Sequence, residues 1–155
     1  MRLLLMRHGI AEDAGPATGW RDEPRALTEE GRARMVAAAR GVARLGEPIE
    51  AGDTTPLGRF VETVGLSPSS DRRLRPGADH DAVCHLLLEH PDARGLLLCG
   101  HQPDMSRLVG AFTGGLVEFR RGTLAVLELA DSTATRGHLR ALYPPAALRL
   151  MGAGG

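Results

Sequence analysis

Two short, uninterrupted apolar runs constrain the fold of this chain more than any other feature of its sequence. Residues 3–6 form the first run, between Arg2 and Arg7, and residues 96–99 form the second, between two glycines. Such runs are typical of strands that are buried on both faces of a parallel sheet. The N-terminal run is too short for a membrane span or for the apolar part of a signal peptide. We therefore expect a central, mostly parallel β-sheet.

Helical patterns alternate with these runs. Thr28 is followed by Glu30 and by an apolar stripe from Met35 to Ala43, which predicts a capped helix that ends near Leu45. Further helices are expected over residues 79–89 and from about residues 54–56 and 106, with weaker strands at residues 49–53 and 74–75.

The last third of the chain has a different pattern. Residues 124–129 and 138–142 flank a polar turn, which predicts a terminal antiparallel hairpin, and the glycine-rich tail at residues 152–155 is expected to fray. Together with the alternating strands and helices, this predicts an α/β fold: a three-layer α/β/α sandwich with a mostly parallel central sheet and a C-terminal antiparallel hairpin. A length of 155 residues fits a single domain, 1–155.

Composition limits the partners. Lys plus Arg and Asp plus Glu both number 19, so the formal net charge is zero and no overall field favours nucleic acid or a membrane as a partner. Cys84 and Cys99 lie in apolar surroundings in the sequence, which favours buried, reduced thiols over a disulfide and predicts a cytoplasmic location.

Polar residues follow both apolar runs where the expected strands end. Arg7-His8-Gly9 follows the first run, and Gly100-His101 follows the second. Ligands of parallel sheets bind beyond the carboxyl ends of the strands, and a glycine there lets the backbone approach a ligand closely. One histidine at a strand end is more often a solvated or capping residue, but two at equivalent ends favour a shared pocket.

A third element adds a positive charge to this expected pocket. Arg59 falls in the first turns of the helix expected after Thr55-Pro56, where the helix N-terminus already favours an anion. With Arg7, His8 and His101, this predicts a phosphate site.

The motifs resemble, in order and spacing, those of the histidine phosphatase superfamily, which has a phosphoglycerate mutase-like fold. Its signature is an Arg-His-Gly triplet, a Ser-Pro-x-x-Arg-x-x-[Gln/Glu]-Thr stretch and a distant Gly-His. The matching residues here are residues 5–9, Thr55-Pro56 with Arg59 and Glu62-Thr63, and Gly100-His101. The resemblance covers nearly the whole chain.

Within the superfamily the chain is similar to the small, SixA-like phosphohistidine phosphatases. The similarity lies in its short length, in the elements at residues 22–28 and 100–103, and in Tyr143-Pro144-Pro145. Thr54-Thr55 stands where Ser-Ser is common, which keeps the hydroxyl. Gln102 and Asp104 stand where this branch often has Asn and Gly, so we expect a different loop shape after His101.

The resemblance and the residue types imply a mechanism. A neutral imidazole is a competent nucleophile near pH 7, which suits His8, and Arg7, Arg59 and His101 can neutralise the phosphoryl oxygens. These four residues are the expected catalytic set. Gly9, Asp22 and Arg25 are the expected substrate-binding residues, and neither a metal nor a cofactor is implied.

No acid for the leaving group stands out at residues 75–81, where Asp79 and Asp81 are read as helix-capping residues. Asp22 could assist proton transfer, although a turn-forming Asp is at least as good an interpretation. A phosphohistidine substrate has an imidazole leaving group that needs less acid assistance than an alkoxide does. The missing acid therefore favours a phosphorylated protein, for example a histidine-phosphotransfer domain, as the substrate.

Two alternatives stay open. One is a phosphomonoesterase of the same superfamily that acts on a small phosphate ester or a nucleotide, although a long helical insertion that could form a lid is missing. The other is a phosphoryl-binding module without turnover, which would be expected to lose His8 or His101.

Other polar clusters are read as surface features. His80, His85 and His90 recur every five residues, which turns them around a helix and argues against a metal site. Two groups of arginines, at residues 72–75 and 120–121, could contact an acidic partner, but a solvated edge is the more common outcome.

Overall fold

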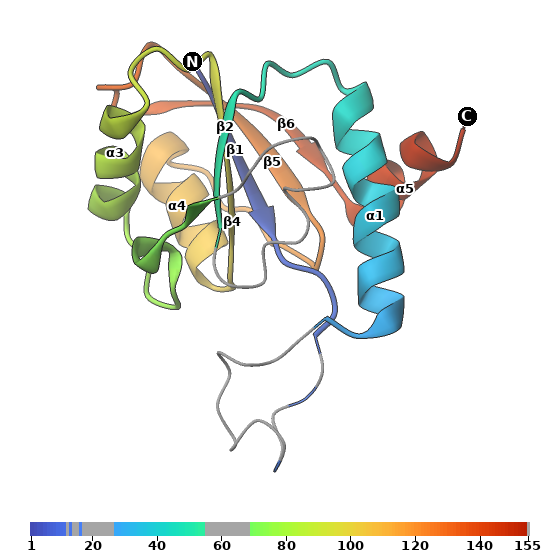
Figure 1. Cartoon of the computed structure of the whole chain (residues 1–155). Helices are drawn as coiled ribbons and strands as arrows, with labels where there is room; N and C mark the ends of the chain where they lie inside the picture. The colour runs from blue at the N-terminus through green and yellow to red at the C-terminus, as the bar shows by residue number, and fades with distance from the viewer. Residues whose placement is uncertain (12, 14–15, 17–26, 55–68, 155) are drawn as a thin grey trace.

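The computed structural model describes residues 1–11, 13, 16, 27–54 and 69–154 (Figure 1). Its elements in chain order are β1 (Arg2–Arg7), α1 (Glu29–Arg44), β2 (Ala51–Thr54), β3 (Ser69–Ser70), the 3-10 helix η2 (Arg72–Leu74), α3 (His80–Glu89), β4 (Gly95–Gly100), α4 (Asp104–Thr113), β5 (Leu124–Leu129), β6 (Gly137–Tyr143) and α5 (Pro145–Ala153).

The strands form one sheet in the order β3-β2-β4-β1-β5-β6. The four strands from β3 to β1 run parallel, whereas β5 is antiparallel to β1 and forms the C-terminal hairpin with β6. Helices α3 and α4 cover one face, and α1 and α5 cover the other (Figure 1). The predicted three-layer sandwich, with its mostly parallel sheet and antiparallel hairpin, is confirmed.

Both central strands are buried on both faces, as their unbroken apolar sequences predicted. Leu5 and Leu98 pack in the cluster that includes residues of α3 and α4, while Leu4 and Leu97 pack in the cluster that includes residues of α1. All four side chains have no exposed surface. Successive residues of a strand point to opposite faces, so only a run without polar residues can occupy this position.

Helix α1 agrees with its predicted start and end. The Thr28 hydroxyl accepts a hydrogen bond of 2.9 Å from the Gly31 amide, which satisfies one of the donors that a helix leaves unpaired at its N-terminus. The predicted helix over residues 79–89 is also confirmed: the Asp79 carboxylate caps α3 by accepting from the Ala82 amide at 2.9 Å.

The strand predicted at residues 74–75 is wrong. Residues 72–74 form η2, and the edge strand lies upstream at Ser69–Ser70. Only two residues of β3 pair with β2, which is too short to leave a hydrophobic pattern, while the apolar character of Leu74 reflects its burial beneath the 3-10 turn. Strand β2 extends to Thr54, α4 begins two residues earlier than predicted, at Asp104, and the helix predicted from residues 54–56 lies outside the described residues.

The predicted fraying of the tail is also wrong for residues 152 and 153, because α5 continues to Ala153 and packs against α1. Two glycines allow this contact. A Cβ atom on Gly41 would lie 2.0 Å from the Leu148 carbonyl oxygen, and one on Gly152 would lie 2.0 Å from the Ala37 carbonyl oxygen. The helices therefore approach each other through their backbones, and a side chain at either position would force them apart.

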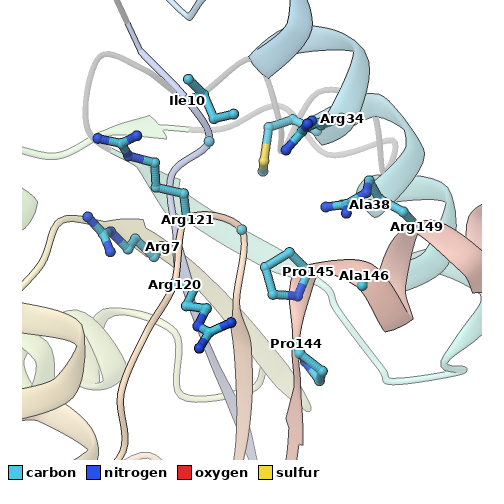
Figure 2. Close-up of a pocket in the computed structure, with 13 residues that line it drawn as sticks. Arg7, Ile10, Arg34, Ala38, Arg120, Arg121, Pro144, Pro145, Ala146 and Arg149 are labelled. Carbon is cyan, nitrogen blue, oxygen red and sulfur yellow. The ribbon is translucent and has the colours of Figure 1, made fainter. Parts of the chain in front are cut away.

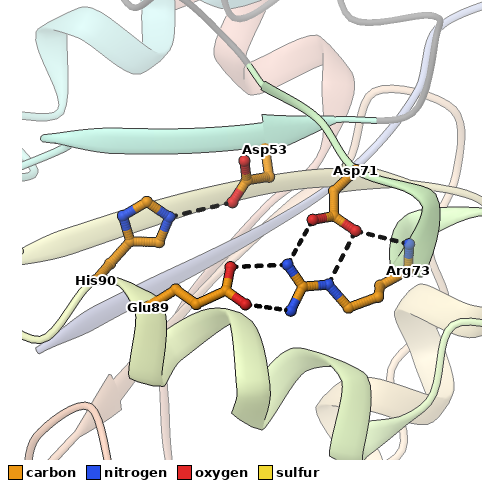
Figure 3. Close-up of polar contacts among 5 residues, drawn as sticks. All are labelled: Asp53, Asp71, Arg73, Glu89 and His90. Atoms are coloured by element: carbon orange, nitrogen blue, oxygen red, sulfur yellow. Dashed lines mark hydrogen bonds and ion pairs between the residues drawn. The ribbon is translucent and has the colours of Figure 1, made fainter.

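An ion-pair network ties η2 to α3, beside a second polar contact between β2 and the end of α3 (Figure 3). Arg73 binds the carboxylates of Asp71 and Glu89 at 2.6 Å each. Nearby, His90 Nε2 lies 3.4 Å from the buried Asp53 carboxylate, whose pKa is raised by burial, an effect that His90 opposes. Arg73, one member of the predicted basic cluster, is thus engaged within the fold.

Both cysteines are free, and burial raises the pKa of Cys99 to about 12, which makes that thiol inert at neutral pH. No helix in the described part of the chain has the length and apolar character needed to cross a membrane.

The α1–α5 contact gives a test of the fold. Gly152→Ala should lower the free energy of unfolding by about 1–3 kcal/mol, because the added methyl group meets a backbone oxygen that cannot move aside. Urea denaturation measures this loss. The matched control is Gly154→Ala, where the nearest atom would be 3.8 Å from the new Cβ. Equal stability of the two variants would contradict the close helix packing.

Candidate active site

His8 and His101 leave the sheet at the same edge. Strands β1 and β4 are adjacent and parallel, and their last residues, Arg7 and Gly100, are in register. The residue that follows each strand is a histidine. The His8 amide donates a hydrogen bond of 3.1 Å to the Gly100 carbonyl. The two imidazole rings lie with their centroids 4.8 Å apart and their planes tilted by 59°.

The His8 ring is oriented by its neighbour. Nδ1 lies 2.7 Å from the Gly9 carbonyl oxygen. A carbonyl oxygen can only accept a hydrogen bond, so Nδ1 carries the proton and the neutral ring has its lone pair on Nε2. This is the tautomer that a nucleophilic histidine attacking through Nε2 requires.

The segment after His8 is fixed on the N-terminus of α1. The Ile10 carbonyl accepts a hydrogen bond of 3.0 Å from the Thr28 amide, and a Cβ on Gly31 would lie 2.0 Å from that carbonyl oxygen. At Gly9 a Cβ would lie 2.5 Å from Met35 Cγ. Glycine at both positions therefore lets this segment lie directly against the helix.

Arg7, the last residue of β1, is held by the segment that precedes β5. Its Nη1 donates to the Phe119 carbonyl at 2.7 Å, while its buried Nε has no hydrogen-bond partner among the described residues. Burial lowers the pKa of Arg7, and the nearby charge of Arg121 lowers it further. The guanidinium is still a cation at neutral pH, and a bound anion would stabilise its charged form.

The turn after His101 is anchored by a residue that sequence reasoning did not identify as important. Asp104 is 3% exposed, and its Oδ2 accepts a hydrogen bond of 2.7 Å from the Gly77 amide. It ties the segment after η2 to the start of α4, which follows His101. The only sequence signal was that Asp104 departs from the pattern of the family.

Three predicted site residues, Arg59, Asp22 and Arg25, lie outside the described residues, as do Glu62 and Thr63. Strand β2 ends at Thr54, which pairs with Cys99 of β4 at the edge where His8 and His101 emerge. Of the predicted site residues, the described part of the chain thus brings together His8, Gly9, Arg7 and His101.

A cavity of about 570 Å³ adjoins this site (Figure 2). Arg7 and Gly9 line it, together with four further arginines from α1, α5 and the segment before β5: Arg34, Arg149, Arg120 and Arg121. No Asp or Glu is among the described lining residues. The sequence could not reveal this cluster, because its members come from distant parts of the chain.

Neither a protein-family model nor a curated protein matches the chain, but solved structures do. The protein histidine phosphatase SixA, solved with tungstate, is 23% identical, with a TM-score of 0.81 over 96% of this chain and 99% of that one. A putative SixA phosphohistidine phosphatase from Nakamurella multipartitia is 22% identical, with a TM-score of 0.77 over 94% of this chain and 96% of that one. The chain has the SixA fold.

The same fold extends to other phosphatases. A mycobacterial glucosyl-3-phosphoglycerate phosphatase is 18% identical, with a TM-score of 0.69 over 90% of this chain and 97% of that one. The alignments with these three structures cover 96%, 94% and 90% of this chain.

The His8 ring gives a test that does not depend on any activity. In ¹⁵N-histidine NMR spectra recorded where the imidazole is neutral, the His8 ring should appear as the Nδ1–H tautomer, because the Gly9 carbonyl accepts that proton. Loss of the signal in His8→Gln assigns it. An Nε2–H tautomer for this ring would contradict the described geometry.

Proposed function

We propose that this chain is a phosphatase of the histidine phosphatase superfamily, in its SixA-like branch, that removes phosphate from phosphohistidine in a protein. The arrangement of His8 and His101 carries the proposal: two imidazoles with centroids 4.8 Å apart at the carboxyl edge of a parallel sheet, one of them with Nδ1 against a carbonyl oxygen. The SixA fold supports it.

In the first step, His8 Nε2 attacks the phosphorus atom in line with the leaving group. The new N–P bond forms as the bond between phosphorus and the substrate's imidazole nitrogen breaks, and the released imidazole takes up a proton from solvent water. Arg7 and Arg59 neutralise the phosphoryl oxygens through forked N–H donors, and His101 donates a ring N–H to the same group.

In the second step, water attacks the phosphorus of the phosphorylated His8. The oxygen–phosphorus bond forms, the bond to His8 Nε2 breaks, inorganic phosphate leaves, and the proton of the water goes to solvent or to the phosphate. The same cationic groups stabilise the second transition state, since the phosphoryl group occupies the same position.

The two acids that follow η2 offer no committed proton donor. Asp79 caps α3, and the side chain of Asp81 is 91% exposed. A phosphohistidine substrate fits this lack of a committed acid. We assign Gly9, Asp22 and Arg25 to substrate binding, and we place this single domain, residues 1–155, in the cytoplasm, where its free cysteines would stay reduced.

A second candidate function is hydrolysis of a small phosphate ester. It is favoured by one observation, the shared fold with a glucosyl-3-phosphoglycerate phosphatase. A panel of phosphohistidine proteins, phosphoamino acids and sugar phosphates, assayed with the purified protein, separates the two candidates by their relative kcat/KM.

His8 should become phosphorylated during turnover. Rapid quenching with a labelled substrate should trap phosphate on His8 as an alkali-stable, acid-labile adduct, because a P–N bond to imidazole has that reactivity. The adduct and the activity should both disappear in His8→Ala. Full turnover by a folded His8→Ala protein would assign the nucleophile to another residue.

Arg59→Ala should lower kcat/KM by about 100-fold or more, since one charged donor to the transition state is worth roughly 3 kcal/mol. Vanadate, which resembles the transition state, should also bind more weakly. Arg59→Lys keeps the charge but loses the forked geometry, so its recovery should be partial.

The matched control for Arg59 is Arg72→Ala, which removes an exposed arginine from η2. An equal loss in this variant would attribute the effect to overall charge. A near-normal kcat/KM in a folded Arg59→Ala protein would refute the assignment of Arg59 to the phosphate site.

A further inference from the structure

The mechanism proposed above uses Arg7 but none of the other four arginines that line the cavity beside it. This cavity comprises the side chains of Arg34, Arg120, Arg121 and Arg149 around an apolar floor that includes Met35 and Pro145. We call it the arginine pocket. Its volume of about 570 Å³ is within the range that holds ligands in proteins.

The positive charge of the arginine pocket is not balanced within the described part of the chain. Arg34 pairs with Glu30 on the exposed surface of α1, a kind of contact that contributes little and exchanges easily. Arg120, Arg121 and Arg149 form no ion pair with any described residue. Because the whole chain carries 19 basic and 19 acidic residues, this concentration of one sign is local.

The geometry of the arginines argues for an extended ligand. In Figure 2, the side chains of Arg7 and Arg121 extend to one side of the view, Arg120 extends away from them, and Arg34 and Arg149 lie on the opposite side. The guanidinium groups thus do not converge on one point. A single phosphate could engage only some of these arginines, whereas several carboxylates along a peptide could each reach a different one.

The position of the pocket connects it to the phosphoryl group. Arg7 and Gly9, the neighbours of His8 in the chain, form part of its wall. The charge of Arg121 already acts on Arg7, so an anion bound between them would relieve this repulsion. A ligand that reaches into the pocket therefore lies beside the position at which His8 attacks the phosphohistidine of the substrate.

We propose that the arginine pocket binds an acidic segment of the phosphorylated protein, adjacent to the phosphohistidine that His8 attacks. This inference rests on the proposed phosphatase function and specifies its substrate class: a phosphoprotein with several Asp or Glu residues beside the phosphorylated side chain. The carboxylates pair with the arginines at the rim, and apolar side chains of the segment contact the floor.

The test uses two peptides that differ only in charge: a phosphohistidine peptide flanked by four Glu residues, and the same peptide with four Gln residues. The wild-type protein should hydrolyse the Glu peptide with a kcat/KM about tenfold higher at low salt, and added NaCl should reduce this ratio, because charge pairs near the surface are screened.

The variant Arg120→Gln with Arg149→Gln should bring the ratio of the two kcat/KM values close to one, since both residues line the pocket and neither belongs to the proposed catalytic set. The matched control, Arg40→Gln with Arg136→Gln, removes the same charge from exposed positions outside the pocket and should keep the tenfold ratio. An equal decrease in both variants would overturn the proposal.

A binding measurement separates this proposal from the proposed function. The same two sequences, carrying a stable analogue of phosphohistidine, are titrated with the wild-type protein in fluorescence anisotropy, which requires no turnover. A preference for the Glu sequence that depends on Arg120 and Arg149, in a protein that hydrolyses neither peptide, would support the docking site and refute the phosphatase function. Equal hydrolysis and equal binding of both sequences would refute the docking site alone.

Tripolyphosphate provides the remaining comparison, since it is a compact polyanion without a peptide. If it binds with an affinity that depends on Arg120 and Arg149 while the Glu sequence gains nothing over the Gln sequence, the pocket serves a compact anion and the acidic-segment proposal is overturned.

Discussion

Strands β1 and β4 pair in register along their full length, and their hydrogen bonds determine where His8 and His101 emerge from the sheet. A shift of one residue in this pairing would separate the two imidazoles and would also exchange the side chains that pack on the two faces of the sheet. The apolar packing on both faces therefore holds the candidate site in position. Stability of the core and geometry of the site depend on the same register.

Hydrogen bonds to backbone atoms restrain the residues on either side of His8 and the His8 ring itself. The Gly9 carbonyl orients His8, the Ile10 carbonyl is held by Thr28, and the half-buried Arg7 side chain is held by the Phe119 carbonyl. Ordering polar groups in advance is costly in a folded chain, but it lowers the reorganisation needed when a charged transition state forms. The described part of the site consists mainly of side chains set against backbone atoms.

Residues with strong local signals could be predicted from the sequence. The unbroken apolar runs predicted β1 and β4, Thr28 and Asp79 predicted the starts of α1 and α3, and the strand ends predicted that His8 and His101 would meet. Helix α5 was missed, because Pro144-Pro145 and Gly152 suggest a turn and a loose tail, whereas proline suits a first helical turn and the glycine serves the contact with α1. The arginine pocket depends on tertiary contacts alone, so no local pattern could reveal it.

The contact between α1 and α5 has a consequence for biosynthesis. Helix α1 is translated well before α5, the partner that covers it through a glycine-mediated contact. Until then the apolar side of α1 that will receive α5 has no cover, and chaperones that recognise exposed apolar helices could bind there. A ribosome that stalls before Pro145 would therefore display an unfinished surface on α1.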